Sequence, residues 1–406
     1  MKKFLLAVAA CSMVIPMAAA APKTPKAPKA KADTASFKFT DVKLVKTNPV
    51  RDQNSSGTCW SFSTTTFLED EILRKGGPSV DLSDMFSVRH VYNGKADKFM
   101  RLNGMGNFGQ GGAAEDVIWV LRNYGLMPEE AYNGLNYGEK KHVHGELANG
   151  MGAFLNAINK NPNRKLSTAW KDALNGIMDA YLGKLPETFT YNGKTYTPKT
   201  FAQELGLNPD DYVSITSYNH HPFYTKFALE IPDNWQWAES NNVPLEDMKA
   251  IVDNALENGY PVAWGADVSE GGFKWNKGYA ILPAAIDEKN LEGTELSRWV
   301  KLSDGERARK QYDVNGPAQL KEEKVTQESR QLGFNNRQTT DDHGMVLVGK
   351  AVDQAGNKYY KVQNSWDDNQ IYGGFFYVSE PYFLAKTMTI MVNKEAIPSE
   401  IAKKMK

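Results

Sequence analysis

The sequence has 406 residues, enough for one large enzyme or for two domains of about 150–200 residues each. Lys and Arg number 48 and Asp and Glu also number 48, so the formal charge is zero and the basic excess that usually marks a nucleic-acid partner is missing. Hydrophobic residues make up 41% and aromatic residues 11%, which excludes a wholly disordered chain. Only two cysteines occur, Cys11 and Cys59, which excludes a disulfide-stapled scaffold and a zinc site built from several thiolates.

Residues 1–20 are typical of a secretory signal peptide. A short basic segment is followed by a mostly apolar run and by four alanines, so we expect cleavage near Ala20 and export, with a periplasmic or secreted location. The apolar run is shorter than the ~20 residues of a membrane span and contains a proline. A lipoprotein anchored at Cys11 is the alternative. Residues 21–36, rich in Ala, Pro and Lys, are predicted to form an extended linker.

Helical patterns dominate the first half of the chain and strand patterns the second. Helices are predicted over residues 59–75, 83–92, 114–124, 170–181 and 245–258. Strands are predicted over residues 261–266, 345–352, 359–363 and 375–378, with a hairpin turn at 354–357. The interval 134–232 is less regular and rich in aromatic residues. This pattern predicts an α+β fold with two lobes, one helical and one built of antiparallel strands.

Cys59 has the local surroundings of a reactive thiol. After removal of a signal peptide it would be the one cysteine left, so it is inert and buried, paired with another molecule, or reactive. It stands at the start of a predicted helix, where the helix dipole and backbone N–H groups favour a thiolate. Gly57 allows a tight turn before it, and the Gln53 side chain could donate to an oxyanion together with the Cys59 N–H.

The segment around Cys59 resembles the nucleophile segment of papain-like cysteine peptidases. Residues 53–62 read Gln-Asn-Ser-Ser-Gly-Thr-Cys-Trp-Ser-Phe. Ser56 stands where many members of that family have a disulfide-forming cysteine, and Thr58 stands where they have Ser or Ala. The missing cysteines point to the bleomycin hydrolase and aminopeptidase C branch, although that branch usually has Arg before the nucleophile.

Two later segments are similar to the histidine and asparagine motifs of the same family. His343 begins an apolar strand, and Asn364 ends the next strand and is followed by Ser365-Trp366. The resemblance implies that Cys59 attacks the peptide carbonyl, that His343 transfers the proton and that Asn364 orients the imidazole. Trp366 would shield the hydrogen bond between the last two from water.

The interval from Cys59 to His343 is 284 residues (343 minus 59), against about 130–150 in papain-like enzymes. The excess predicts large helical insertions, much of them at 134–232, in a papain-like two-lobed domain over 37–392 with a β-barrel-like second lobe. Gly111 and Gly112 resemble the glycines of the strand on which these enzymes bind extended substrates.

Together with the predicted signal peptide, the resemblance implies an exported thiol aminopeptidase that acts on peptides through a thioester, without cofactor or metal. It also implies a homohexameric ring and a C-terminal arm, here residues 393–406, that lies in the cleft. The alternatives are an endopeptidase of the same fold and a non-catalytic peptide-binding homologue. The histidine pairs 142/144 and 220/221 are not predicted to bind metal. Asp341 and Asp342 are interpreted as solvated loop charges.

Overall fold

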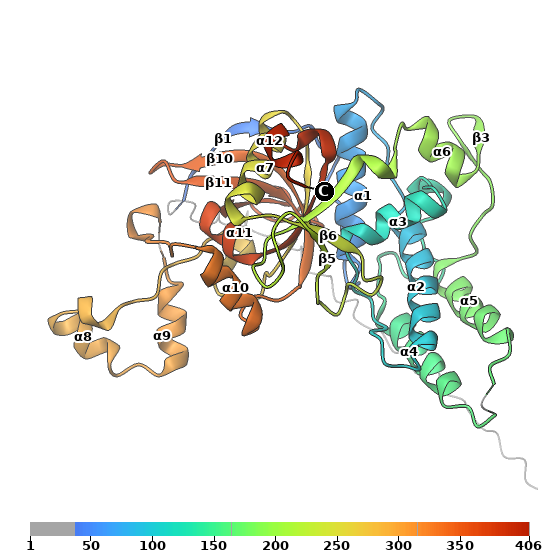
Figure 1. Cartoon of the computed structure of the whole chain (residues 1–406), viewed down its shortest axis with the longest axis horizontal. Coiled ribbons are helices and arrows are strands. Elements are labelled where there is room, and N and C mark those ends of the chain that lie inside the picture. The colour runs from blue at the N-terminus through green and yellow to red at the C-terminus, as the bar shows by residue number, and fades with distance from the viewer. Residues whose placement is uncertain (1–36, 164, 315, 406) are drawn as a thin grey trace, which may run out of the picture. The chain divides into compact units, whose positions relative to one another are not determined.

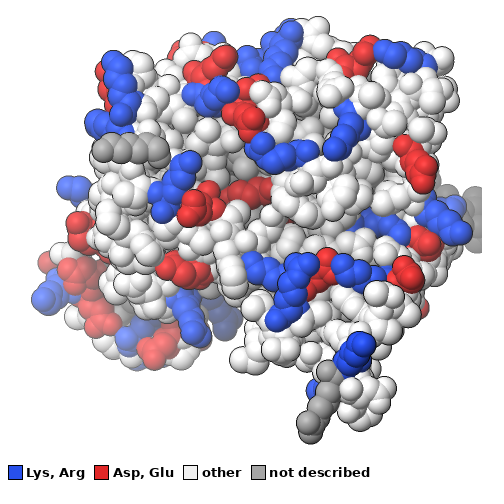
Figure 2. Space-filling model, turned by 45° about the vertical axis from the view of Figure 1, so that its right-hand side comes forward, with Lys and Arg blue, Asp and Glu red and all other residues white. Residues whose placement is uncertain are grey.

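The computed structural model of the protein describes residues 37–163, 165–314 and 316–405. The predicted signal peptide and linker therefore lie outside the described residues. Among those that are described, no helix has the length and apolar character needed to cross a membrane. Lys, Arg, Asp and Glu are interspersed on the face drawn in Figure 2, consistent with the zero net charge.

One side of the structure is built from helices (Figure 1). They are α1 (Cys59–Arg74), α2 (Asp84–Arg101), α3 (Ala114–Asn123), α4 (Gly145–Asn159), α5 (Ala169–Leu182) and α6 (Pro198–Glu204). The predicted helices that begin at Cys59, Ala114 and Trp170 are confirmed within a residue or two. Helix α4 has no counterpart in the sequence-based expectation. Between α5 and α6 lies a small hairpin of β2 (Phe189–Tyr191) and β3 (Lys194–Tyr196).

Helix α2 is longer than its sequence pattern predicts. Ser83 caps its start by accepting a hydrogen bond of 3.0 Å from the Phe86 N–H, as expected. The predicted end near Tyr92 is wrong, because the helix continues through Gly94 to Arg101. A Cβ atom at Gly94 would lie 2.6 Å from the ring of Trp235. Glycine is therefore required here by packing against a distant segment and does not end the helix.

The other side is a large sheet, which confirms the α+β prediction. Its strand order is β5-β6-β4-β13-β7-β10-β11-β12-β9-β8, with β1 paired to β10. Only the pairs β4/β6 and β9/β12 are parallel. The bounds are β1 (Phe39–Leu44), β4 (Tyr212–Thr216), β5 (Lys226–Ala228), β6 (Glu239–Asn242), β7 (Val262–Ala266), β8 (Phe273–Lys274), β9 (Tyr279–Ala280), β10 (His343–Asp353), β11 (Lys358–Gln363), β12 (Phe375–Ser379) and β13 (Thr387–Asn393).

The remaining helices accompany the sheet. Helix α7 (Leu245–Glu257) confirms a predicted helix, and α10 (Gln327–Asn335), α11 (Glu380–Lys386) and α12 (Ser399–Ala402) lie in the same half of Figure 1. Helices α8 (Gly293–Trp299) and α9 (Asp304–Gln311) project from its lower left. The two halves meet along α1, whose first turn contacts Gly344 on β10.

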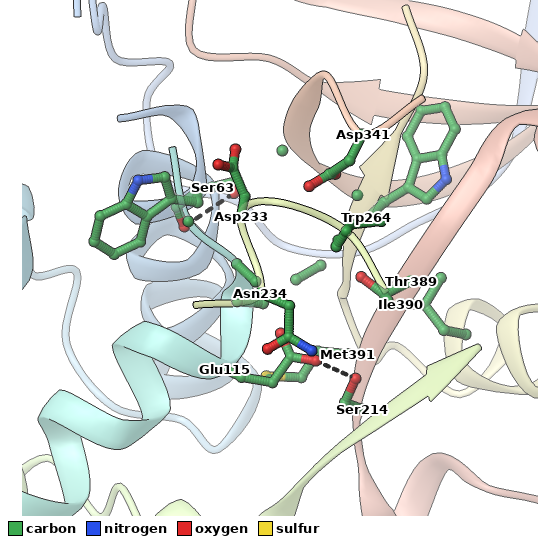
Figure 3. Close-up of a pocket in the computed structure, with 18 of the residues that line it drawn as sticks. Ser63, Glu115, Ser214, Asp233, Asn234, Trp264, Asp341, Thr389, Ile390 and Met391 are labelled. Carbon is green, nitrogen blue, oxygen red and sulfur yellow. Dashed lines mark hydrogen bonds between the residues drawn. The ribbon is translucent and has the colours of Figure 1, made fainter. Parts of the chain in front are cut away.

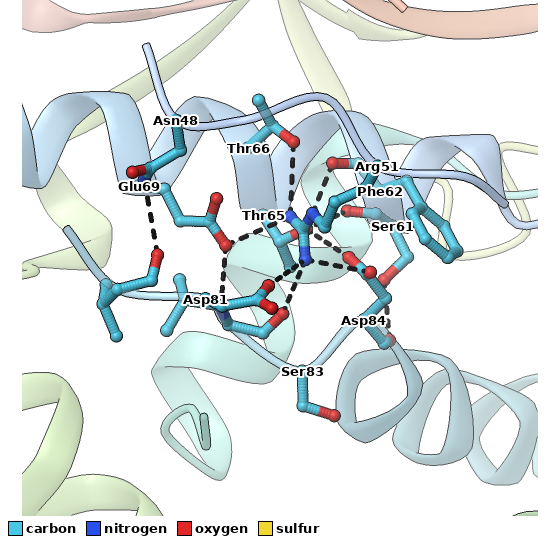
Figure 4. A network of polar contacts seen from close by, with 12 residues as sticks. Asn48, Arg51, Ser61, Phe62, Thr65, Thr66, Glu69, Asp81, Ser83 and Asp84 are labelled. Atoms are coloured by element: carbon cyan, nitrogen blue, oxygen red, sulfur yellow. Dashed lines mark hydrogen bonds and ion pairs between the residues drawn. The ribbon is translucent and has the colours of Figure 1, made fainter. Parts of the chain in front are cut away.

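The segment that leads into α1 is fixed by Arg51 (Figure 4). Its guanidinium donates to the hydroxyls of Thr65 and Thr66 on α1 at 2.8 and 3.2 Å and forms ion pairs of 3.1 and 3.0 Å with Glu69 and Asp84. Although burial works against its charge, these carboxylates raise the Arg51 pKa. This buried cation thus joins the segment before Cys59 to α1 and α2.

Candidate active site

A cleft lies where the first turn of α1 meets the start of β10. Cys59 is the first residue of α1 and His343 the first residue of β10, and both line this cleft. Its walls come from both halves of the structure (Figure 3). They include residues 112–115 before and in α3, residues 263–265 of β7 and residues 389–391 of β13.

The thiol of Cys59 is held by backbone groups at the helix start. The N–H groups of Gly344 and Trp60 hydrogen-bond its sulfur. The preceding turn is tied to the glycine-containing loop, because the Gly57 N–H donates to the Gln110 Oε1 at 2.8 Å and the Trp60 indole donates to the Gln110 carbonyl at 2.9 Å. The turn before Cys59 and this loop are therefore held together by hydrogen bonds.

His343 and Asn364 are paired directly. The imidazole Nε2 lies 2.7 Å from the Asn364 Oδ1, and both side chains are buried. The same Oδ1 also accepts from the Ser365 N–H at 2.8 Å, which fixes the amide so that its oxygen faces the imidazole. An oxygen can only accept here, so Nε2 carries the hydrogen of the neutral ring and Nδ1 is left as the basic nitrogen.

Burial disfavours an isolated charge on either reactive group. It raises the pKa of the Cys59 thiol to about 12, although the two backbone N–H groups oppose this. It lowers the pKa of His343 to about 4, against the hydrogen bond to Asn364, which raises it. A thiolate beside an imidazolium is neutral as a pair, so proton transfer within the pair costs less than ionising either group alone.

Gln53 is buried beside this pair and is held on both ends. Its Oε1 accepts from the Ser365 hydroxyl at 2.7 Å, and its Nε2 donates to the Ser56 carbonyl at 2.8 Å. The backbone N–H of Gln53 also donates to the Ser365 carbonyl at 2.9 Å. An amide nitrogen has two hydrogens, so one remains after the bond to Ser56. The segment after Asn364 thus positions Gln53 as well.

Gly111 and Gly112 lie at the rim of the cleft with no room for side chains. A Cβ at Gly111 would fall within the carboxylate of Asp233, and one at Gly112 would lie 2.9 Å from the Trp60 ring. The buried Lys95 supports this loop by donating to the carbonyl of Gly109 at 2.9 Å and to that of Gly111. Nothing in the local sequence around Lys95 pointed to this role, since the partners lie a helix turn and a loop away.

Three carboxylates in the cleft were missed or misread from the sequence. The interpretation of Asp341 as a solvated loop charge is wrong, because this side chain is partly buried in the cleft and burial raises its pKa to about 8. Its position two residues before His343 was a usable signal. Asp233 and Glu115 also line the cleft, and no sequence signal linked them to the cysteine. Asp342 is exposed, as expected.

Four of the five histidines outside the cleft lie in two groups, and the fifth, His90, lies on α2. His142 and His144 are buried with ring centroids 5.5 Å apart, and burial lowers the pKa of each to about 4. His220 and His221 both lie 3.0 Å from the carboxylate of Glu230. This last trio has the residue types of a metal site, but its rings are engaged by the carboxylate and it lies apart from Cys59.

The C-terminal segment packs away from the cleft. The carbonyl of Ala396 accepts from the Asn254 side chain on α7 at 2.8 Å, and the Lys404 ammonium lies 3.3 Å from the Tyr224 hydroxyl. Helix α12 follows the same surface. Of the described residues, none after Asn393 lines the cleft, which differs from the arm that the family resemblance implies.

Known proteins resemble this chain along most of its length. The model of the papain family cysteine protease matches residues 35–183, and that of the peptidase C1-like family matches residues 288–406. Aminopeptidase C of Lactobacillus delbrueckii subsp. lactis is 23% identical over 403 residues, covering 88% of this chain and 82% of the relative. Bleomycin hydrolase of Homo sapiens is 20% identical over 403 residues, covering 87% and 82%.

A solved structure shares the fold. The crystal structure of PepW from Lactobacillus rhamnosis HN001 superposes with a TM-score of 0.66 at 18% identity, covering 90% of this chain and 84% of that one. The chain is a papain-like cysteine peptidase. Within that class it belongs to the branch that contains aminopeptidase C and bleomycin hydrolase.

Proposed function

We propose that the protein is an aminopeptidase in which Cys59 is the nucleophile, His343 the general base and acid, and Asn364 the residue that orients the imidazole. The observation that carries these roles is the 2.7 Å contact between His343 Nε2 and Asn364 Oδ1 beside the cleft that Cys59 shares. It leaves Nδ1 free to take a proton. Relatives named aminopeptidase C and aminopeptidase W support the exopeptidase assignment.

The reaction has two halves, acylation of the Cys59 thiol and hydrolysis of the resulting thioester. The thiol proton of Cys59 moves to Nδ1 of His343 as Sγ attacks the carbonyl carbon, and the oxyanion faces the Cys59 N–H and the second hydrogen of Gln53 Nε2. The imidazolium then protonates the leaving amine, and a thioester remains. In the second half, Nδ1 takes a proton from water as the water oxygen attacks the thioester carbonyl. The amino acid is released, and the imidazolium returns the proton to sulfur.

We expect the substrate backbone to bind along the loop at Gly111 and Gly112. Glycines allow a peptide backbone to approach closely, and the walls at 263–265 and 389–391 enclose the residue before the scissile bond. Trp366 covers the side of the imidazole opposite to the cleft chemistry, with ring centroids 4.5 Å apart. These features support cleavage of an extended peptide.

Two measurements test the proposal. An epoxysuccinyl thiol-protease inhibitor should label the protein, and Cys59→Ala should abolish both the label and all hydrolysis. A digest of matched peptides with free and acetylated amino termini, read by mass, should show single residues released only from the free peptides. Absence of the label from folded protein would contradict the enzyme role. Internal cleavage of acetylated peptides would favour the endopeptidase alternative.

Export and assembly complete the proposal. Cleavage near Ala20 would give a mature chain that starts near residue 21, which intact-mass measurement of the protein from a periplasmic or culture fraction tests. An uncleaved, lipidated or cytoplasmic chain would contradict it. The homohexamer implied by the family resemblance predicts a light-scattering mass six times that of one chain. A mass equal to that of one chain would contradict the hexameric ring.

A further inference from the structure

The cleft beside Cys59 is strongly acidic. Four carboxylates line it, from Glu115, Asp233, Asp341 and Asp342, and no lysine or arginine occurs among the described residues of its wall. Figure 3 shows the carboxylates of Asp233 and Asp341 facing one another across the cleft, with Glu115 farther along the same wall. Like charges this close disfavour joint ionisation, and Asp233, Asp342 and Glu115 all raise the pKa of Asp341.

The four carboxylates differ in the hydrogen bonds that they accept from the protein. Asp342 accepts from the N–H groups of Val268 and Ser269 at 3.2 Å each and from a threonine hydroxyl. Asp233 accepts from the Asn107 side chain at 2.9 Å. Asp341 has no hydrogen bond or ion pair within the described chain, although burial raises its pKa to about 8. The Asp341 carboxylate therefore has acceptor positions open toward the cleft.

Glu115 is also incompletely satisfied. Its Oε1 lies close to the hydroxyls of Ser214 and Ser240, whereas its Oε2 is buried without a partner in the described part of the protein. Buried carboxylate oxygens are normally paired, because an unpaired one loses its hydration without compensation. Two carboxylates in one cleft thus have open acceptor positions.

Lys95, a buried cation close to the glycine loop, does not fill these positions. Lys95 lies behind the glycine loop and donates to the carbonyls of Gly109 and Gly111. Its charge lowers the pKa of Asp233, whereas the charges that act on Asp341 are those of Asp233, Asp342 and Glu115. The C-terminal segment packs on α7 and, as far as it is described, adds no group to the cleft. A positive charge bound at these carboxylates would therefore come from outside the described residues.

We infer that Asp341 and Asp233, assisted by Glu115, bind a cationic amino or guanidinium group of the substrate directly beside Cys59. This inference rests on the proposed peptidase function and names its substrate class. The cation has two sources, the α-ammonium of the amino-terminal residue or a basic side chain next to the scissile bond. Its binding would also offset the negative field of Asp233, which raises the Cys59 pKa, and so favour the thiolate when substrate is present.

The test compares three coumarylamide substrates: alanyl, acetyl-leucyl-alanyl and acetyl-arginyl-alanyl. The variants are Asp341→Asn and the Asp233→Asn/Asp341→Asn double variant. Asp368→Asn, an exposed acid on another loop, makes the same charge change and is the control. We expect each cleft variant to lower kcat/KM by roughly 10- to 100-fold, mainly through KM, on the cationic substrates and about 2-fold or less on the uncharged one.

The substrate arms identify the source of the cation. A loss confined to the alanyl substrate assigns the α-ammonium, and a loss on the arginyl substrate assigns the basic side chain. Equal kinetics for wild type and both variants on every cleaved substrate would overturn the inference while leaving the peptidase role intact. Failure of wild type to cleave any substrate or take the epoxysuccinyl label would instead overturn the proposed function.

A second readout does not need turnover. Neutral iodoacetamide reports the thiolate of Cys59, so Asp341→Asn should speed alkylation of the unliganded protein at a fixed pH of about 9, where Asp341, with its pKa of about 8, is ionised. An unchanged alkylation rate in a folded variant would remove the electrostatic link between Asp341 and the nucleophile.

Discussion

The indole of Trp366 lies over the imidazole of His343, with ring centroids 4.5 Å and planes 30° apart. The edges of Phe273 and Trp275 pack against the same indole at 6.0 and 5.4 Å. These aromatic rings help to keep His343 only 5% exposed, although its imidazole borders an open cleft. The aromatic layer thus contributes to the burial that lowers the imidazole pKa.

Trp366→Ala should shift the pH dependence of catalysis. Burial lowers the His343 pKa to about 4, so removing the cover should raise that pKa toward its ordinary value of 6.5. A protonated imidazole cannot accept the thiol proton, so the acid limb of kcat/KM should move to higher pH. Because the imidazole would also be held less firmly, we expect kcat to fall by about 10²-fold.

The matched control is Trp237→Ala, which removes an indole that is 62% exposed and does not line the cleft. Its pH profile should match wild type. An unchanged acid limb in folded Trp366→Ala protein would mean that the indole does not set the imidazole environment.

Arg51→Met should be strongly destabilising. It removes the cation that faces Glu69 and Asp84, both of which are buried. Breaking a buried ion pair by removing one partner costs about 3–5 kcal/mol. Arg122→Met removes an exposed pair with Asp210, where both side chains are at least half exposed, and should cost no more than ~1 kcal/mol. Urea unfolding of the two variants checks the contrast, and equal midpoints would contradict it.

The sequence made some parts of the site predictable and left others hidden. Cys59, His343 and Asn364 could be predicted because each stands in a short motif at the start or end of a helix or strand, where local sequence decides the conformation. The papain-like fold followed from their order. Asp233 could not be predicted, because it reaches Gly111 from more than a hundred residues away through a loop without a pattern.

Helix α2 illustrates the same limit. Asn93 and Gly94 are poor helix residues, so local propensity predicts an end near Tyr92. Packing of Trp235 against Gly94 outweighs that propensity, and the sequence offers no sign that these two residues meet. Asp341 differs, since its neighbour His343 marked the place and only its degree of burial was misjudged.

Gly111→Ala should act through Asp233. The new methyl group would occupy the position of the Asp233 carboxylate, so this side chain or the loop must move. We expect a kinetic loss on cationic substrates similar to that of Asp233→Asn. At Gly109 a Cβ would meet only the Asn107 Oδ1 at 3.6 Å, an ordinary contact, so Gly109→Ala should leave kinetics nearly unchanged. Equal behaviour of the two alanine variants would argue against this steric role.

Asp341 should impose a stability cost that grows with pH. Its pKa in the folded protein is about 8, above the ordinary 3.8, so the folded state holds a proton that the unfolded state releases. Stability from this group is therefore fully present below about pH 3.8 and is lost as pH rises through about 8. Asp341→Asn has no such proton. Its Tm should approach that of wild type near pH 4 and exceed it by a few degrees near pH 8.5.

The same measurement can be made with a cation in the cleft. A bound amine favours the ionised carboxylate and lowers the Asp341 pKa, so it should stabilise wild type more than Asp341→Asn at pH 8.5. Saturating arginine amide is a suitable probe, with the Asp368→Asn variant expected to respond as wild type does. A Tm difference between Asp341→Asn and wild type that stays constant from pH 4 to 8.5, with or without the amine, would show that Asp341 is ionised throughout and carries no open acceptor.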